Sequence, residues 1–129
     1  MHVILSTTGP RRWISGIFRE PQDAHEWLTR LPSEGRVHHS LECILPTQFP
    51  FFILEDHSGF RFLDASDATR LVEFMPHAPP NADPILFAIL AEFRPNVAGR
   101  DEMGCLPHVH LDQEHLAELR EHGLRALTR

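Results

Sequence analysis

Lysine is absent from this sequence of 129 residues, and all 12 of its basic residues are arginines. The 18 acidic residues outnumber them, which gives a formal net charge of −6 and a pI near 5.9. A protein that binds nucleic acid normally carries a basic face that neutralises phosphates. The charge balance therefore argues against DNA or RNA as a partner. The exclusive use of arginine is typical of a GC-rich genome, and we expect a bacterial source.

Cysteines, glycines and long apolar runs are also scarce. The two cysteines, Cys43 and Cys105, do not form the disulfide framework of a small secreted protein. The 7 glycines are scattered and form neither a phosphate-binding loop nor a dinucleotide-binding motif. The longest apolar run, residues 85–91, is far shorter than the roughly 18 residues of a membrane span, and no basic residue precedes the first apolar run as in a signal peptide. We expect a cytoplasmic protein that does not bind membranes.

The composition is that of a folded protein. Apolar residues make up 42% of the chain and charged residues 23%, which is close to the average for soluble globular proteins. A chain of this length can bury one hydrophobic core without the help of a disulfide or a metal. We therefore expect a single domain that spans residues 1–129.

Three segments show the signals of amphipathic helices. Two of them have apolar residues at helical spacing, namely Ala24, Trp27, Leu28 and Leu31 in one and Ala68, Leu71, Val72 and Met75 in the other. Pro21 suits the first turn of the first helix, and Asp64 or Ser66 can cap the second. In the third segment, Asp112 is the expected N-cap, and Gly123 is expected in the left-handed conformation that ends a helix.

Two stretches of the chain, residues 16–32 and 59–76, agree in the order of their features. Each has an aromatic strand end, an acidic residue, an alanine, an apolar helical stripe and a terminal proline. The acidic residues are Asp23 and Asp67, and each is followed directly by an alanine. The match indicates a strand-to-helix unit that is used twice, either through duplication or through shared rules of helix capping.

Alternation of polar and apolar residues predicts several strands. In residues 36–45 the side chains expected to face the core are Val37, Leu41, Cys43 and Leu45. Two aromatic runs predict a hairpin whose turn contains Asp56, His57, Ser58 and Gly59. Further strands are expected at residues 2–6, 13–18, 85–93 and 106–111. Residues 85–93 equally suit a buried helical turn. Short connections favour antiparallel pairing. We expect an α+β fold with a mixed or mainly antiparallel sheet and about three amphipathic helices packed on one face.

His108 and His110 are the first candidates for chemistry, because two residues that are two apart on a strand project from the same face. His115, Asp112 or Glu114, from the following helix, could add a third metal ligand and leave a position open for water, as in catalytic zinc sites. Cys105 has the parity of Val109 instead, so we leave it out of this set. The alternative is that Val109 and its neighbours face the core while both histidines face solvent. No HExxH or paired CxxC motif accompanies the histidines.

A second cluster consists of His38, His39, Glu42 and Cys43. A histidine beside a cysteine can activate the thiol as a nucleophile, but the alternation places Cys43 with the core residues and predicts a buried, inert thiol. If the two histidine-bearing strands were neighbours, His38 could approach His108 and add an imidazole to the metal site. The run Asp56, His57, Ser58 contains the letters of a catalytic triad, and we interpret it as a turn because a triad is a spatial arrangement.

Two regions are candidates for binding because exposed turns and loops commonly carry function. They contain Asp56 and His57 in the hairpin turn, and Arg94, Arg100, Asp101 and Glu102 in a loop. The middle of the chain is acidic, and an acidic face can attract a cationic protein while it repels acidic ones.

We therefore expect a non-catalytic, protein-binding or regulatory α+β domain, for example an inhibitor or immunity-type factor, with another protein as partner and no cofactor. The alternative is a small metal-binding protein or metal-dependent hydrolase that holds a divalent transition metal through His108, His110 and His115.

Overall fold

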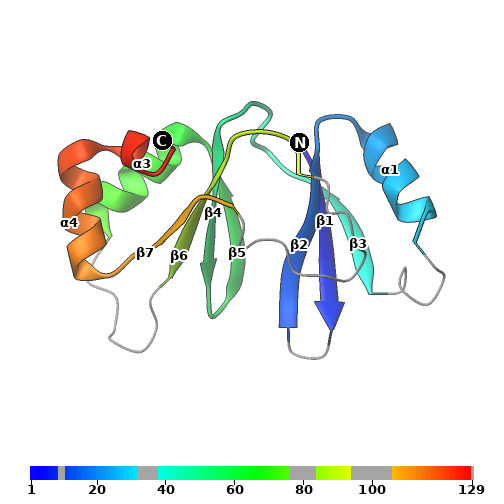
Figure 1. Ribbon diagram of the computed structural model, residues 1–129, viewed down its shortest axis with the longest axis horizontal. Coiled ribbons are helices and arrows are strands. Elements are labelled where there is room, and N and C mark those ends of the chain that lie inside the picture. Colours follow the sequence, from blue (N-terminus) through cyan, green and yellow to red (C-terminus); the bar gives the residue numbers. More distant parts are fainter. Residues whose placement is uncertain (9–10, 32–37, 76–83, 94–105, 129) are drawn as a thin grey trace. The chain divides into compact units, whose positions relative to one another are not determined.

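The computed structural model describes residues 1–8, 11–31, 38–75, 84–93 and 106–128 (Figure 1). In chain order the elements are β1 (His2–Thr8), β2 (Arg11–Phe18), α1 (Pro21–Thr29), β3 (His39–Cys43), β4 (Phe51–Asp56), β5 (Gly59–Leu63), α3 (Ala65–Phe74), β6 (Ile85–Ile89), β7 (His108–His110), α4 (Gln113–His122) and the 3-10 helix η2 (Leu124–Ala126). In the described part of the chain the strands form two sheets, and every pairing is antiparallel. The predicted α+β class is confirmed.

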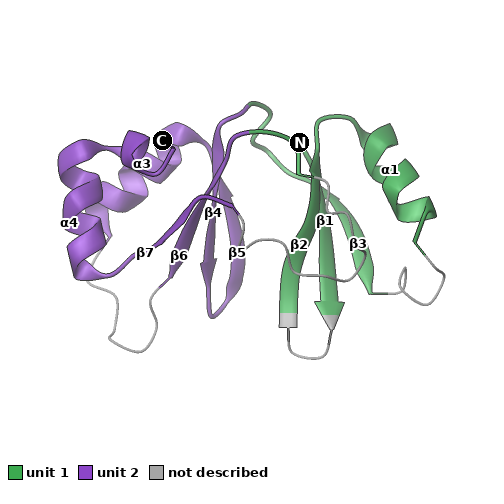
Figure 2. Cartoon of the chain, viewed as in Figure 1, with its two compact units in different colours: residues 1–48, 91–105 green, residues 49–90, 106–129 purple. Residues whose placement is uncertain are grey.

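The chain divides into two compact units (Figure 2). Unit 1 comprises Met1–Gln48 and Ala91–Cys105, and unit 2 comprises Phe49–Leu90 and Leu106–Arg129. Helix α1 contacts β1 and β2 in unit 1, whereas α3 contacts β4 and β5 in unit 2. Each unit has a buried hydrophobic cluster of its own. The expectation of one domain over residues 1–129 stays a prediction.

Both units contain the same ββαβ arrangement. In unit 1 the strand order is β2-β1-β3, and in unit 2 it is β5-β4-β6-β7. In each unit the first two strands pair, a helix follows, and the next strand pairs with the free side of the first. The strand-to-helix unit predicted from sequence is therefore part of a longer shared arrangement. Capping rules do not dictate on which side the later strand pairs, so the likeness of the two units extends beyond helix capping.

The helix of each ββαβ arrangement packs through an alanine. Ala24 of α1 and Ala68 of α3 are both 0% exposed. Ala24 lies in a cluster with Ile4 and Phe18, and the cluster around Ala68 includes Leu63, the last residue of β5. A small side chain at this position lets the helix backbone approach the sheet closely.

Strand β3 corrects one prediction. Leu41 packs against the core cluster of unit 1, as expected, but Cys43 is exposed and Leu45 is 93% exposed. Cys43 lies opposite His2 at the end of the ladder, whereas Leu41 lies opposite Ile4 in the cluster. Ile44, which has the opposite parity, is buried instead. The neighbouring strand β1 carries buried apolar residues on both of its faces, so the alternation of residues along β3 does not identify a single interior side. The predicted buried thiol is therefore wrong.

The core of unit 2 joins its sheet to α3 and α4. Its buried members are Phe52, Leu54, Leu63, Ala68, Val72, Leu86, Ala88, Leu111, Leu116 and Leu119. Asp64, rather than Ser66, caps α3, because its Oδ1 atom accepts the backbone N–H of Asp67 at 2.7 Å. Residues 85–89 form a strand, which settles the alternative of a helical turn.

Candidate functional site

The candidate site lies in unit 2, where β7 leads into α4. Asp112 is the N-cap of α4, as predicted, and its Oδ1 atom accepts the backbone N–H of His115 at 2.8 Å. The Nδ1 atom of the His115 ring lies 2.8 Å from each oxygen of the same carboxylate. Leu111 and Leu116, which flank the N-cap, are both buried in the core of unit 2. The start of α4 is therefore held by both the backbone and a side chain.

The contact between His115 and Asp112 shifts the pKa of each partner. The pKa of His115 is raised, chiefly by the hydrogen bond to Asp112, with further contributions from the charges of Asp112, Glu114 and Glu118 and opposed by partial burial. The pKa of Asp112 is lowered by the hydrogen bonds from the backbone and the ring of His115. The two groups therefore form an ion pair over a wider pH range than isolated side chains would.

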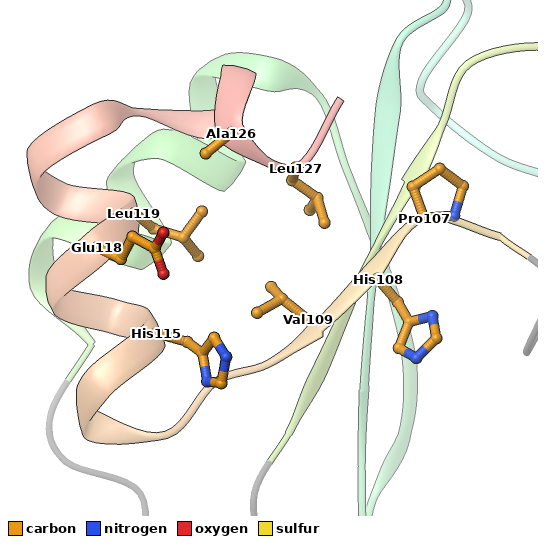
Figure 3. Close-up of a pocket in the computed structure, with 8 residues that line it drawn as sticks. All are labelled: Pro107, His108, Val109, His115, Glu118, Leu119, Ala126 and Leu127. Atoms are coloured by element: carbon orange, nitrogen blue, oxygen red, sulfur yellow. The ribbon is translucent and has the colours of Figure 1, made fainter. Parts of the chain in front are cut away.

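A pocket of about 240 Å³ lies beside this pair, between β7, α4 and η2 (Figure 3). It is lined by Pro107, His108, Val109, His115, Glu118, Leu119, Ala126 and Leu127. Aliphatic side chains from all three elements line the pocket, together with the carboxylate of Glu118 and the imidazole of His115. We call it the α4 pocket. It combines apolar surface with titratable groups, which suits a ligand that has an apolar body and a charged end.

Strand β7 separates its residues as the predicted alternation requires. Val109 packs against the core of unit 2, and in Figure 3 its side chain points towards α4 while the ring of His108 points to the other side of the strand. His108 and His110 share a face, and their ring centroids are 6.2 Å apart at an interplanar angle of 72°. The Nδ1 atom of His108 donates a hydrogen bond to the carbonyl oxygen of Leu106 at 2.8 Å. We call His108 and His110 the histidine pair.

The structure does not bring His115 to the histidine pair. The His115 ring is held by Asp112, and among the described residues no group of three or more His, Cys, Asp or Glu side chains could hold a metal ion. The capping carboxylate holds the ring on the helix side of β7, and the role of His115 as a third metal ligand stays a prediction. His38 precedes β3, which lies in the other sheet, so the two histidine-bearing strands are not sheet neighbours. Cys105 lies outside the described residues.

The other predicted binding residues divide into two groups. Asp56 and His57 lie at the β4–β5 hairpin, where Asp56 Oδ1 accepts the backbone N–H of Ser58 at 2.8 Å and its hydroxyl at 2.5 Å. These hydrogen bonds lower the pKa of Asp56, and the turn predicted there is confirmed. The loop candidates Arg94, Arg100, Asp101 and Glu102 lie outside the described residues.

One residue near the site was missed in the sequence. Arg120 of α4 donates from Nε to the carbonyl oxygen of Val72 at 2.8 Å and from Nη2 to that of Met75 at 2.7 Å. These carbonyl oxygens lie at the C-terminal end of α3, where no further helical turn donates N–H groups to them. The sequence shows a basic residue near the end of α4, but nothing in its spacing indicates that it would donate hydrogen bonds to carbonyl oxygens of α3.

Comparison of the chain with models of protein families, with curated proteins and with solved structures finds no match. None of the described helices is both long and apolar enough to cross a membrane. Evidence about function therefore comes from the geometry of the α4 pocket and of the histidine pair.

Proposed function

We propose that the protein is a non-catalytic regulatory protein that binds a basic partner protein through the α4 side of unit 2. The observation that carries this proposal is the α4 pocket, in which Glu118 stands beside the apolar residues Val109, Leu119 and Leu127. An arginine side chain of a partner has the matching chemistry, because its stem is apolar and its head is a cation that pairs with a carboxylate.

The size of the pocket also favours a side chain over a metabolite. Pockets for small-molecule ligands typically enclose about 300–1,000 Å³, and the α4 pocket encloses about 240 Å³. Buried arginine and aromatic anchors dominate the energy of many protein interfaces. A partner that inserts one such side chain would bury its stem against Leu119 and Leu127.

The charges of α4 support a basic partner. Glu114, Glu118 and Glu121 lie on this helix and are exposed. Arg120 also lies on α4, but its guanidinium group is bound to carbonyl oxygens of α3. Three carboxylates thus lie on α4, and one of them, Glu118, lines the pocket. An acidic surface of this kind speeds association with a cationic partner and disfavours acidic proteins.

The lining of the pocket supports a non-catalytic role. A histidine held by a carboxylate resembles the base of a nucleophilic enzyme, but such a base needs a hydroxyl or thiol to activate. The eight residues that line the α4 pocket include no serine, threonine or cysteine. The His115–Asp112 pair instead caps a helix. The proposal includes a cytoplasmic location, which suits the free and exposed thiol of Cys43.

The test is affinity capture from cells of the native host, followed by measurement of Kd for the captured protein. We expect a basic partner whose binding weakens by about tenfold or more in Glu118→Lys and weakens as salt is raised. Glu26→Lys is the matched control, since Glu26 is an exposed glutamate on α1 of unit 1. It should change Kd by less than about twofold.

Two results would overturn the proposal. One is a captured partner whose affinity responds equally to Glu118→Lys and Glu26→Lys. The other is a purified protein that captures no partner and turns over a general hydrolase substrate.

A further inference from the structure

The structure points to a second site, on the face of β7 that carries the rings of His108 and His110. We propose that His108 and His110 together bind one divalent transition-metal ion through their imidazole nitrogens. His108 also lines the α4 pocket and His110 does not, but the inference uses the imidazole nitrogens of the two rings and not the carboxylate of Glu118 that the proposed partner would contact.

The spacing of the two rings suits a shared ion. Both residues are exposed, and strand alternation places them on one face. Their centroids are 6.2 Å apart. Two imidazoles that share an ion through bonds of about 2.0–2.1 Å have centroids from about 4.5 Å apart at a right angle to about 6.4 Å apart when the ion lies on the line between them. The observed separation is at the wide end of this range, so binding at a smaller angle would bring the two rings closer together.

Hydrogen bonding fixes the tautomer of His108. A carbonyl oxygen can only accept, so the Nδ1 atom that lies 2.8 Å from the Leu106 oxygen carries the proton. In the neutral ring this leaves the lone pair on Nε2, the atom that would bind the ion. Metal-binding histidines commonly donate their other ring N–H to a carbonyl or carboxylate, which orients the ring and raises its basicity. The Nδ1 atom of His108 makes a hydrogen bond of this kind to the Leu106 oxygen.

Packing limits the freedom of the same ring. Phe87 of β6 lies opposite His108 in the strand register, and the two ring centroids are 5.4 Å apart. Ile85 lies opposite His110 in the same ladder. The pairing of β6 with β7 therefore sets the position of both imidazoles, and an ion would meet a partly ordered pair of ligands.

The donor set defines the class of ion. Imidazole nitrogens suit Zn²⁺, Ni²⁺ and Cu²⁺, and among divalent ions Cu²⁺ generally binds such ligands most tightly. The described residues supply two ligands here, so water or a group from another molecule would complete the coordination. The site is therefore a surface chelate, unlike the three-ligand catalytic centre that the sequence suggested.

The test uses untagged full-length protein titrated with Cu²⁺. We expect one ion per chain, with an electron paramagnetic resonance spectrum that shows two equatorial nitrogens. His108→Gln and His110→Gln should each weaken binding by about tenfold or more and remove one nitrogen from the spectrum. The matched controls are His57→Gln and His122→Gln, which replace exposed histidines elsewhere in unit 2 and should leave the affinity unchanged within about twofold.

A second measurement tests the assignment of atoms. In a nitrogen-15 spectrum of the histidine rings with Zn²⁺, the Nε2 signal of His108 should shift while its Nδ1 remains protonated. Equal Cu²⁺ affinity in His108→Gln and the wild type would overturn the proposal, as would Zn²⁺ shifts confined to other histidines. Unchanged thermal melting of the variants without metal shows that loss of binding does not come from loss of fold.

Discussion

The Nδ1 atom of His115 lies 2.8 Å from both carboxylate oxygens of Asp112, and one of these oxygens also accepts the backbone N–H of His115 at 2.8 Å. The carboxylate thus caps α4 and pairs with an imidazole at once. Because the third residue of the helix reaches back to the N-cap, the arrangement is similar to a capping box in which histidine replaces glutamate. The stability of the helix start is therefore linked to the charge of two groups.

This pair predicts a stability that depends on pH. The pKa of His115 is raised from its ordinary 6.5, so its contribution is complete below 6.5 and is lost as the pH rises through the folded pKa. The pKa of Asp112 is lowered from 3.8, so its contribution is present above 3.8 and is lost as the pH falls through the folded pKa. The pair therefore stabilises most between 3.8 and 6.5. His115→Ala should lower Tm more at about pH 5.5 than at about pH 8.5.

The control is His122→Ala, which removes an exposed histidine from the other end of α4. Subtracting its Tm shift removes the general effect of losing an imidazole from this helix. Equal losses of Tm in His115→Ala at the two pH values would contradict the linkage.

The hydrogen bonds from Arg120 of α4 to the end of α3 predict that removing this side chain lowers the stability of the fold. Arg120→Ala would leave the carbonyl oxygens of Val72 and Met75 without their guanidinium donors. We expect the free energy of unfolding in urea to fall by about 1.5–3 kcal/mol, the range for hydrogen bonds that involve a charged group. Arg125→Ala, on the exposed side of η2, should change it by less than about 0.5 kcal/mol.

Arg120→Lys separates charge from geometry. An ammonium group keeps the positive charge near the end of α3 but cannot present the two N–H groups of the guanidinium fork. Its loss of stability should fall between those of the wild type and Arg120→Ala. A lysine variant as stable as the wild type would show that charge alone is sufficient.

The features that were predictable from sequence are local. The burial of Ala24 and Ala68 follows from helical spacing, and the caps at Asp64 and Asp112 follow from the chemistry of the N-cap. The common face of His108 and His110 follows from strand alternation. Each of these depends on neighbours within about one turn or one strand, which sequence spacing describes.

The features that were not predictable depend on distant partners. Cys43 has the parity of a core residue, and only its pairing with His2 at the end of the ladder shows why it is exposed. Arg120 contacts residues of another helix, which no periodicity indicates. His115 fitted two roles in the sequence, ligand and helix residue, and its spacing of three from Asp112 was the signal that favoured the second.

The buried alanines predict similar responses in the two units. Ala24→Leu and Ala68→Leu each place a larger side chain where the helix meets the sheet, at positions that are 0% exposed. Overpacking of this kind costs about 1–3 kcal/mol, which urea unfolding would measure. Ala117→Leu is the control, because Ala117 is exposed on α4. If Ala24→Leu or Ala68→Leu proved as mild as Ala117→Leu, close packing of the helix at that alanine would be refuted.

Replacement by alanine should lower stability at both Gly16 and Gly123, but for a different physical reason at each position. A Cβ atom at Gly16 would lie 2.6 Å from Cε2 of the buried Phe18 ring, so the cost of Gly16→Ala is a clash. At Gly123 a Cβ would meet nothing within 4 Å, but the backbone has φ 74° and ψ 178°, a region that is essentially restricted to glycine. This φ is positive as predicted, although ψ differs from that of the left-handed helical conformation. Gly123→Ala should therefore cost about 1–3 kcal/mol through the backbone alone.

A double variant distinguishes the two causes. Phe18→Leu removes the ring atoms that a Cβ at Gly16 would meet, so Gly16→Ala should cost less in the Phe18→Leu background than in the wild type. The difference is a coupling energy, expected at about 0.5–3 kcal/mol for residues in contact. Leu124, which follows Gly123 and packs against the core of unit 2, offers the parallel test, since Leu124→Ala cannot relieve strain at the Gly123 backbone and should give little coupling. Additive costs for Gly16→Ala and Phe18→Leu would show that the Phe18 ring moves aside freely and that Gly16 is not required by packing.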